Sequence, residues 1–276
     1  MLIPLHDDNP LRHIRFPYVT VGFIALCVLV FLYQSTLDPR AERVFVMSYG
    51  AIPAAVFGIA ERGEAIAAIP ATVTLLTSMF LHGGFMHLAG NMLFLWVLGD
   101  NVEDAMGHPR FVAFYLLSGL AAALAHAGLD PGSKIPMIGA SGAISGVIGA
   151  YLVLHPKASI KTLVLRFIVN LPAWVVLGLW IGFQFLNVAM APKGAGGVAW
   201  WAHIGGFVAG AILIFVFRQR DVPLFDKGYV PPAPLGAIVA LKTWNAIQSP
   251  STTHAGRSTT NRSTSVLIGA WGCSTK

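Results

Sequence analysis

A serine framed by glycines stands inside a stretch of sequence that is apolar enough to lie in lipid. The stretch is "IGASGAISG" (138–146), in which Gly139 precedes Ser141 by two positions and Gly142 follows it. A serine hydroxyl is a weak nucleophile until a neighbouring base accepts its proton, and neutral histidine is the usual base. His203 is the candidate base, so the two residues could form a nucleophile and its general base.

Acyl transfer also needs hydrogen-bond donors aimed at the oxyanion of the tetrahedral intermediate. His87 and Asn91, in "HGGFMHLAGNM" (82–92), lie four residues apart and share one helix face. Their side chains and the backbone N–H of Ser141 are the predicted donors. Gly139 permits a loop conformation closed to other residues and leaves clearance for a substrate. A helix that starts at Ser141 directs free N–H groups toward an anion.

The composition indicates which environment these residues occupy. The 276 residues are 55% hydrophobic and 11% charged, with a mean hydropathy of +0.69, whereas soluble domains carry about 25% charged residues. A membrane protein with the lipid bilayer as its partner is predicted. The net charge of +6 comes from basic residues scattered between apolar runs, so nucleic acid is not an expected partner. Cys27 and Cys273 imply no disulfide framework.

Six apolar runs predict an all-α membrane protein, a bundle of six transmembrane helices. The runs cover about residues 17–33, 85–98, 111–129, 139–154, 172–191 and 199–217. The segment 36–84 is predicted to be an extramembrane loop with short interfacial helices. The predicted organisation is a cytoplasmic N-terminal segment at 1–16, a catalytic domain at 17–220 and a Pro/Ser/Thr-rich tail at 221–276, disordered because it is too polar to bury a core.

The charge distribution orients the predicted spans. Eight basic residues fall on the side of both termini (Arg12, Arg15, Arg110, Lys157, Lys161, Arg166, Arg218, Arg220) and five on the other (Arg40, Arg43, Arg62, Lys134, Lys193), which places the termini in the cytoplasm. The second, fourth and sixth spans then run the same way, so their polar residues lie at similar depth.

Helical spacing predicts how two of these spans pack together. One strip of small residues is Ser141, Ser145 and Gly149, and another runs from His203 through Gly206 and Gly210. Small residues let membrane helices approach closely. If the two strips pack together, the serine and the histidine come toward hydrogen-bonding distance.

Other interpretations compete with catalysis. A single small-residue motif in a span is usually a packing device, and a single histidine is often a satisfied core residue. A small transporter would need acidic midplane groups or an inverted repeat, and neither is evident. No acidic residue is central to a span and no His-Glu-x-x-His occurs, so an aspartyl dyad and that type of zinc site are excluded. The remaining prediction is a Ser-His dyad that uses no metal and no cofactor.

Four motifs in this order resemble the rhomboid family of intramembrane serine proteases. They are "HGGFMHLAGNM" (82–92), "LGDNVEDAMGHPRFVAFYLLSG" (98–119), "GASG" (139–142) and "AHIGGFVAG" (202–210), and the resemblance covers about residues 1–220. It implies cleavage of a peptide bond in or near the transmembrane segment of single-span membrane proteins. It also implies a bacterial inner membrane as the location.

The resemblance also implies roles for individual residues. Ser141 matches the family nucleophile, His203 its base, His87 and Asn91 its oxyanion donors, and Gly139 a residue lining the substrate path. His82 matches a histidine of the surrounding hydrogen-bond and water network. Glu103 and Arg110 match structural positions. Substrate entry in the family is placed between the second and fifth spans, where Trp180, Phe183 and Gln184 are the residues expected to line the gate.

One departure from the family and one alternative function remain open. Some relatives carry an aromatic residue four positions after the nucleophile that stacks on the catalytic histidine, whereas this chain has Ser145 there. The sequence therefore identifies no group that orients His203. The alternative is a non-catalytic rhomboid-like protein that binds and escorts membrane clients, against which the intact serine and histidine argue. The oligomeric state is not indicated.

Overall fold

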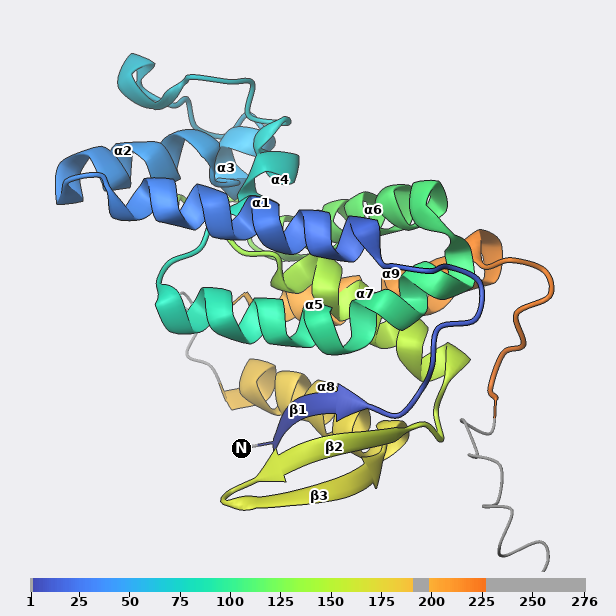
Figure 1. Ribbon diagram of the computed structural model, residues 1–276. Helices are drawn as coiled ribbons and strands as arrows, with labels where there is room; N and C mark the ends of the chain where they lie inside the picture. The colour runs from blue at the N-terminus through green and yellow to red at the C-terminus, as the bar shows by residue number, and fades with distance from the viewer. Residues whose placement is uncertain (1, 191–198, 227–276) are drawn as a thin grey trace, which may run out of the picture. The chain divides into compact units, whose positions relative to one another are not determined.

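Long apolar helices are the main elements of residues 2–190 and 199–226, the part of the chain that this computed structural model describes (Figure 1). The longest are α1 (Tyr18–Ser35), α5 (Phe85–Met106), α6 (His108–Leu129), α7 (Ser141–Leu154), α8 (Ala173–Met190) and α9 (Trp200–Phe217). By length and composition α1, α6, α8 and α9 could each cross a membrane, and α5 could do so with the segment Thr74–Phe80, which is bent by 93° against it.

Helix α7 is the shortest of these elements. Its 14 residues extend about 21 Å at 1.5 Å per residue, less than the hydrocarbon thickness of roughly 30 Å. The described residues therefore hold four to five candidate spans, and the count of six stays a prediction.

Two predicted boundaries differ from the structure. Helix α5 continues past the predicted end at Leu98 to Met106, because the polar residues of its last turns are buried with partners. Residues 221–226, predicted as the start of a disordered tail, instead lie against the bundle: the N–H of Phe225 donates to Val153 O at 2.9 Å, and Val222 is buried. The rest of the tail from 227, and residues 191–198 with Lys193, lie outside the described residues.

The segment between α1 and α5 contains the short helices expected there. They are α2 (Pro39–Tyr49), α3 (Pro53–Val56), η1 (Glu64–Ile66), α4 (Thr74–Thr77) and η2 (Ser78–Phe80). Asp38 caps α2 by accepting the backbone N–H of Arg40 and Ala41 at 2.8 and 3.0 Å. The guanidinium of Arg62 donates to the carbonyls of Ser48 and Ile69. These bonds fix the conformation of the segment between α1 and α5, much of which lies outside regular helices.

A three-stranded antiparallel sheet makes the all-α prediction wrong in one respect. Strand β1 (Leu2–Asp7) pairs with β2 (Ser159–Val164), which pairs with β3 (Phe167–Pro172). The register places Ile3 opposite Leu163 and Ile160 opposite Leu171. Branched residues favour strands in 160–169, but the strand that completes the sheet comes from the other end of the sequence. Periodicity within either segment cannot reveal that pairing.

Glycines set the separation of α7 and α9. A Cβ added to Gly206 would collide with the carbonyl oxygen of Gly142, and one added to Gly210 with that of Gly146; Gly149 has no room beside Phe207 O. The predicted strip on α9 is confirmed. The α7 strip, predicted as Ser141, Ser145 and Gly149, is confirmed at Gly149 and wrong by one position at the two serines, because the contact runs through Gly142, Gly146 and Gly149. Backbone, not serine side chain, forms the contact.

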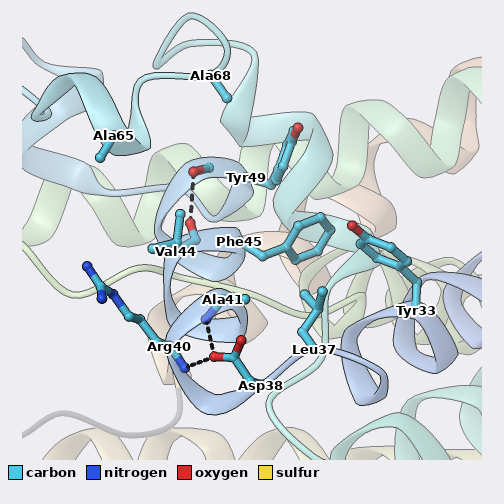
Figure 2. Close-up of a pocket in the computed structure, with 11 residues that line it drawn as sticks. Tyr33, Leu37, Asp38, Arg40, Ala41, Val44, Phe45, Tyr49, Ala65 and Ala68 are labelled. Atoms are coloured by element: carbon cyan, nitrogen blue, oxygen red, sulfur yellow. Dashed lines mark hydrogen bonds between the residues drawn. The ribbon is translucent and has the colours of Figure 1, made fainter.

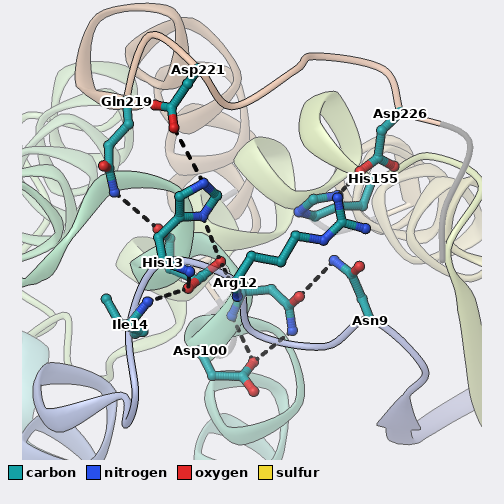
Figure 3. A network of polar contacts seen from close by, with 11 residues as sticks. Asn9, Arg12, His13, Ile14, Asp100, His155, Gln219, Asp221 and Asp226 are labelled. Atoms are coloured by element: carbon teal, nitrogen blue, oxygen red, sulfur yellow. Dashed lines mark hydrogen bonds and ion pairs between the residues drawn. The ribbon is translucent and has the colours of Figure 1, made fainter. Parts of the chain in front are cut away.

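A polar network fastens both ends of the described chain to the end of α5 (Figure 3). The Asp104 carboxylate accepts the backbone N–H groups of Arg12, His13 and Ile14 at 3.0, 2.6 and 2.7 Å. The His13 ring lies 3.0 Å from Asp104 and 3.6 Å from Asp221. Glu103 accepts the N–H groups of Val19 and Thr20 at the start of α1. Glu103 is thus structural, as the sequence indicated.

Asp7 is the most unusual ionisable group in this region. It ends β1 with 5% of its surface exposed, and its carboxyl oxygen lies 2.6 Å from Tyr151 Oη and 3.0 Å from Asn101 Nδ2. Burial raises the pKa of Asp7 to about 7. The hydrogen bond from Tyr151 opposes this shift, and the nearby carboxylate of Asp100 adds to it.

Substituting a contact glycine tests the α7–α9 packing. Gly210→Ala is expected to reduce the free energy of unfolding by about 1–3 kcal/mol, because overpacking forces two backbones apart. The measurement is the thermal unfolding midpoint of the detergent-purified protein. Gly178→Ala on α8, where an added Cβ meets nothing within 4 Å, is the matched control. Equal midpoints for the two variants would contradict the close contact.

The burial of Asp7 predicts a pH-dependent stability. Its folded pKa of about 7 exceeds the ordinary 3.8, so the folded state binds the extra proton. The stabilisation is full below about pH 4 and is lost as the pH rises to about 7, by roughly 4 kcal/mol at most. Thermal midpoints at pH 5 and pH 8 measure it. Asp7→Asn should show a smaller fall than the wild type, and an equal fall in both would contradict the assignment.

Candidate active site

The two residues proposed as nucleophile and base meet in the structure. Ser141 is the first residue of α7 and His203 lies in the first turn of α9. Ser141 Oγ and His203 Nε2 are 2.8 Å apart. The distance suits proton transfer from a serine hydroxyl to a neutral imidazole. The close packing of the two helices through their glycines brings these side chains within reach.

The second ring nitrogen of His203 has a partner that the sequence did not identify. His203 Nδ1 lies 2.8 Å from Oε1 of Gln184 on α8, and both residues are buried, with 8% and 3% of their surface exposed. The rings of Trp180 and Trp200 lie 5.8 and 5.9 Å from the imidazole. Gln184 was expected only at the substrate gate. A carboxamide within an otherwise apolar span was the sequence signal for a second role.

Gly139 adopts a backbone conformation that explains its identity. Its φ is +123°, a region that residues with a Cβ rarely adopt. A Cβ here would also lie 2.8 Å from Cε1 and Nε2 of His87 and 3.7 Å from Nδ2 of Asn91. The N–H of Gly139 donates to Ser78 O at 2.9 Å. The loop before Ser141 is therefore bonded to η2, and the His87 ring of α5 occupies the space that a side chain at residue 139 would need.

The two predicted oxyanion donors come from the first turns of α5, as the spacing indicated. Asn91 is buried with 8% exposed, and its Nδ2 has no hydrogen-bond partner among the described residues. His87 is exposed. Both side chains lie beside Gly139, two residues before Ser141. No side chain caps the start of α7, so its first N–H groups also face this region.

His82 lies beside His87, and its hydrogen bonds to other described residues are made by its backbone and not by its ring. The ring is fully buried, lies 5.3 Å from the ring of His87, and has no hydrogen-bond partner within the described chain. Its backbone N–H donates to Gln34 Oε1 at 3.2 Å, and its carbonyl accepts from Gln34 Nε2 at 3.1 Å. These two bonds connect the segment that precedes α5 to helix α1. A role for the His82 ring stays a prediction.

Two cavities bear on where a ligand could bind. A small cavity of about 30 Å³, near the volume of one water, is lined by Ser141, Gly139 and Ala202, among other residues. A larger one of about 510 Å³ lies between the end of α1 and α2 (Figure 2). Its lining contains none of the candidate site residues, and the Asp38 carboxylate in it already caps α2. Of the candidate site residues, Ser141 and Gly139 line the smaller cavity, whereas His203, His87 and Asn91 are not among its lining residues.

The conformation of Gly139 can be tested through the reactivity of Ser141. Gly139→Ala is expected to slow labelling by a serine-directed fluorophosphonate at least 10-fold, because the new Cβ displaces the His87 ring or the loop. Gly128→Ala, at a glycine with open space near the end of α6, should label at the wild-type rate. Wild-type labelling of Gly139→Ala would show that the loop conformation does not matter.

Comparisons with known proteins place this arrangement in a family. A family model described as the Rhomboid domain matches residues 70–220. RHOMBOID-like protein 5 of Arabidopsis thaliana is 34% identical over 168 residues, covering 57% of this chain and 48% of that protein. Rhomboid protease GluP of Bacillus subtilis is 28% identical over 236 residues, covering 85% and 42%. Rhomboid protease AarA of Providencia stuartii is 32% identical over 225 residues, covering 72% of each.

The extent of these matches decides what they show. The chain spans 48% and 42% of the length of the first two relatives, and the family model covers more than half of this chain. The family includes proteins named as proteases, and the apolar helices are those of an integral membrane protein. The chain belongs to the rhomboid family.

Proposed function

We propose that this protein is an intramembrane serine endopeptidase that cleaves transmembrane segments of single-span membrane proteins. The observation that carries the proposal is the 2.8 Å separation between Ser141 Oγ and His203 Nε2. Ser141 is the nucleophile and His203 the general base. The names of GluP and AarA, both rhomboid proteases, support the same chemistry.

The arrangement suits a two-step acyl transfer. Ser141 Oγ attacks the scissile carbonyl while its proton passes to His203 Nε2. The oxyanion then accepts hydrogen bonds from the Asn91 amide, from His87 and from the backbone N–H of Ser141; losing one such donor typically costs about 2.7–4 kcal/mol. His203 gives the proton to the leaving amine as the C–N bond breaks. In the second step His203 takes a proton from the water that attacks the acyl-enzyme and returns it to Ser141 Oγ as the ester bond breaks.

The small residues around Ser141 suit an extended peptide rather than a bulky ligand. Gly139 carries no side chain that could obstruct a peptide beside the nucleophile, and its missing Cβ lets the His87 ring approach the loop. A helical peptide bond is shielded by its own hydrogen bonds, so the substrates should carry helix-weakening residues near the cut and a small residue before it. Entry from the lipid would pass between α5 and α8, whose Phe94 and Trp180 rings are 6.1 Å apart, with Phe183 also at this gate.

The membrane placement is part of the proposal. α7 and the bent pair ending in α5 complete six spans, and residues 17–220 form the catalytic domain between a cytoplasmic segment at 1–16 and a C-terminal tail. Both termini face the cytoplasm of a bacterial inner membrane, and the active site opens to the opposite side. That opening is required because hydrolysis needs water at a depth from which lipid excludes it.

Labelling with a fluorophosphonate tests the dyad. Detergent-purified wild type should label, and Ser141→Ala and His203→Ala should reduce the rate by at least 10³-fold, since removal of either dyad member disables the nucleophile. Ser35→Ala, at an exposed serine whose hydroxyl bonds Phe31 O, is the control. Cleavage of a tagged single-span substrate should follow the same order.

Two outcomes would contradict the protease assignment. In the first, folded wild type labels no faster than Ser141→Ala. In the second, wild type labels but releases no fragment from any tagged single-span protein that it binds. The second result would favour a protein that escorts membrane clients.

A further inference from the structure

The hydrogen bonds of Gln184 fix the orientation of its amide. Gln184 Nε2 donates to the carbonyl of Trp180, one turn earlier on α8, at 3.0 Å. If the amide were rotated by 180°, its oxygen would face that carbonyl oxygen, and two acceptors would oppose each other in a buried site. Oε1 is therefore the atom that faces His203.

The fixed amide determines which nitrogen of His203 carries the proton. Oε1 of Gln184 can only accept, so His203 Nδ1 at 2.8 Å must be its donor. In a neutral imidazole with a protonated Nδ1, Nε2 keeps its lone pair. That lone pair faces Ser141 Oγ at 2.8 Å. Gln184 thus selects the one neutral tautomer in which His203 can accept a proton from Ser141.

We infer that Gln184 is the positioning residue of the Ser141–His203 dyad, which holds the imidazole through Nδ1 in its base-competent tautomer and orientation. The inference rests on the proposed function as far as reaction rates are concerned, although the tautomer can be observed without turnover. It assigns to α8 the task that an aromatic residue after the nucleophile performs in some relatives, since Ser145 instead bonds the carbonyl of Ser141 at 2.5 Å.

The neighbouring side chains support a directional role rather than simple packing. Trp180 and Trp200 restrict the imidazole on two sides, but a ring confined by apolar surfaces can still carry its proton on either nitrogen. Among the described residues, Gln184 is the hydrogen-bond partner of Nδ1. Its backbone anchor at Trp180 links the tautomer to the helix that borders the proposed gate.

The chain contains a matched control on the same helix. Asn187 lies three residues after Gln184, and its Nδ2 donates to Phe183 O at 2.7 Å, the same bond to the carbonyl four residues earlier. Among the described contacts, this amide makes that backbone bond and none to His203. Gln184→Leu and Asn187→Leu therefore each remove an amide bonded to the carbonyl four residues earlier, and only the first removes the acceptor at Nδ1.

The tautomer test uses ¹⁵N-histidine NMR of the full chain carrying Ser141→Ala, which removes the competing bond at Nε2. The His203 signals are assigned by their loss in His203→Ala. The expected result is a protonated Nδ1 that loses population to protonated Nε2 on Gln184→Leu and is unchanged on Asn187→Leu. An Nδ1 proton that persists in Gln184→Leu, or one that is absent before the substitution, overturns the inference.

The rate test uses the same amide substitutions with Ser141 intact. Gln184→Leu should lower kcat about 10²-fold with KM nearly unchanged, less than the 10⁴-fold seen when a charged orienting group is replaced, and Asn187→Leu should change neither. Gln184→Glu keeps an acceptor and should recover part of the rate. Its carboxylate favours the imidazolium, so the acidic limb of the pH–rate profile should move to higher pH.

The two tests separate failure of the inference from failure of the proposed function. Wild-type protein without activity would overturn the protease, while a Gln184-dependent tautomer would still establish the positioning contact. Active wild type with an equally active Gln184→Leu would overturn the positioning role. An impaired Gln184→Glu with an unshifted acidic limb would reduce Gln184 to a packing residue.

Discussion

Helices α7 and α9 touch through their backbones, with Gly206 and Gly210 lying against the carbonyl oxygens of Gly142 and Gly146. At this separation the first turns of the two helices are adjacent, and Ser141 and His203 are side chains of those turns. A single methyl group along the contact would push the helices apart. Because a displacement of about 1 Å in a catalytic geometry can cost 10²-fold in rate, the proposed reactivity of the serine depends on the glycines of the α7–α9 contact, which lie further along the two helices.

Backbone N–H groups near the end of α5 are bonded to acidic side chains, whereas some donors near Ser141 have no partner among the described residues. Beside the sheet, Asp104 accepts three backbone N–H groups and Glu103 two, so acidic side chains replace the water that those groups would otherwise bind. At the other end, the amide of Asn91 and the start of α7 keep donors without partners among the described residues. Unsatisfied donors cost stability. In the proposed mechanism, the developing negative charge of the oxyanion would accept hydrogen bonds from Asn91 and from the start of α7.

The sequence predicted which of the candidate residues lie together better than it predicted the fold around them. Ser141, His203, His87, Asn91 and Gly139 are placed together because each lies at a helix start or loop that apolar length and helical spacing define. Strand β1 was missed because it pairs with the distant segment β2. Two of the three residues of the α7 strip were assigned one position off because serine and glycine are both small. Gln184 was placed on the right helix, but its partner depends on the rotation of α8, which spacing alone does not give.

The neutrality of the site follows from its surroundings. A carboxylate beside His203 would place a permanent charge among apolar helices, where ionised groups are costly; among the described residues, the ring nitrogens of His203 are bonded to Gln184 and Ser141 and to no acidic side chain. A carboxamide fixes the same tautomer without that cost. It does not stabilise the imidazolium as strongly, so more of the charge separation in the transition state must be stabilised at the oxyanion. In the proposed mechanism, the donors beside Gly139 and the carboxamide on α8 therefore have complementary roles: the first stabilise the oxyanion and the second orients the base.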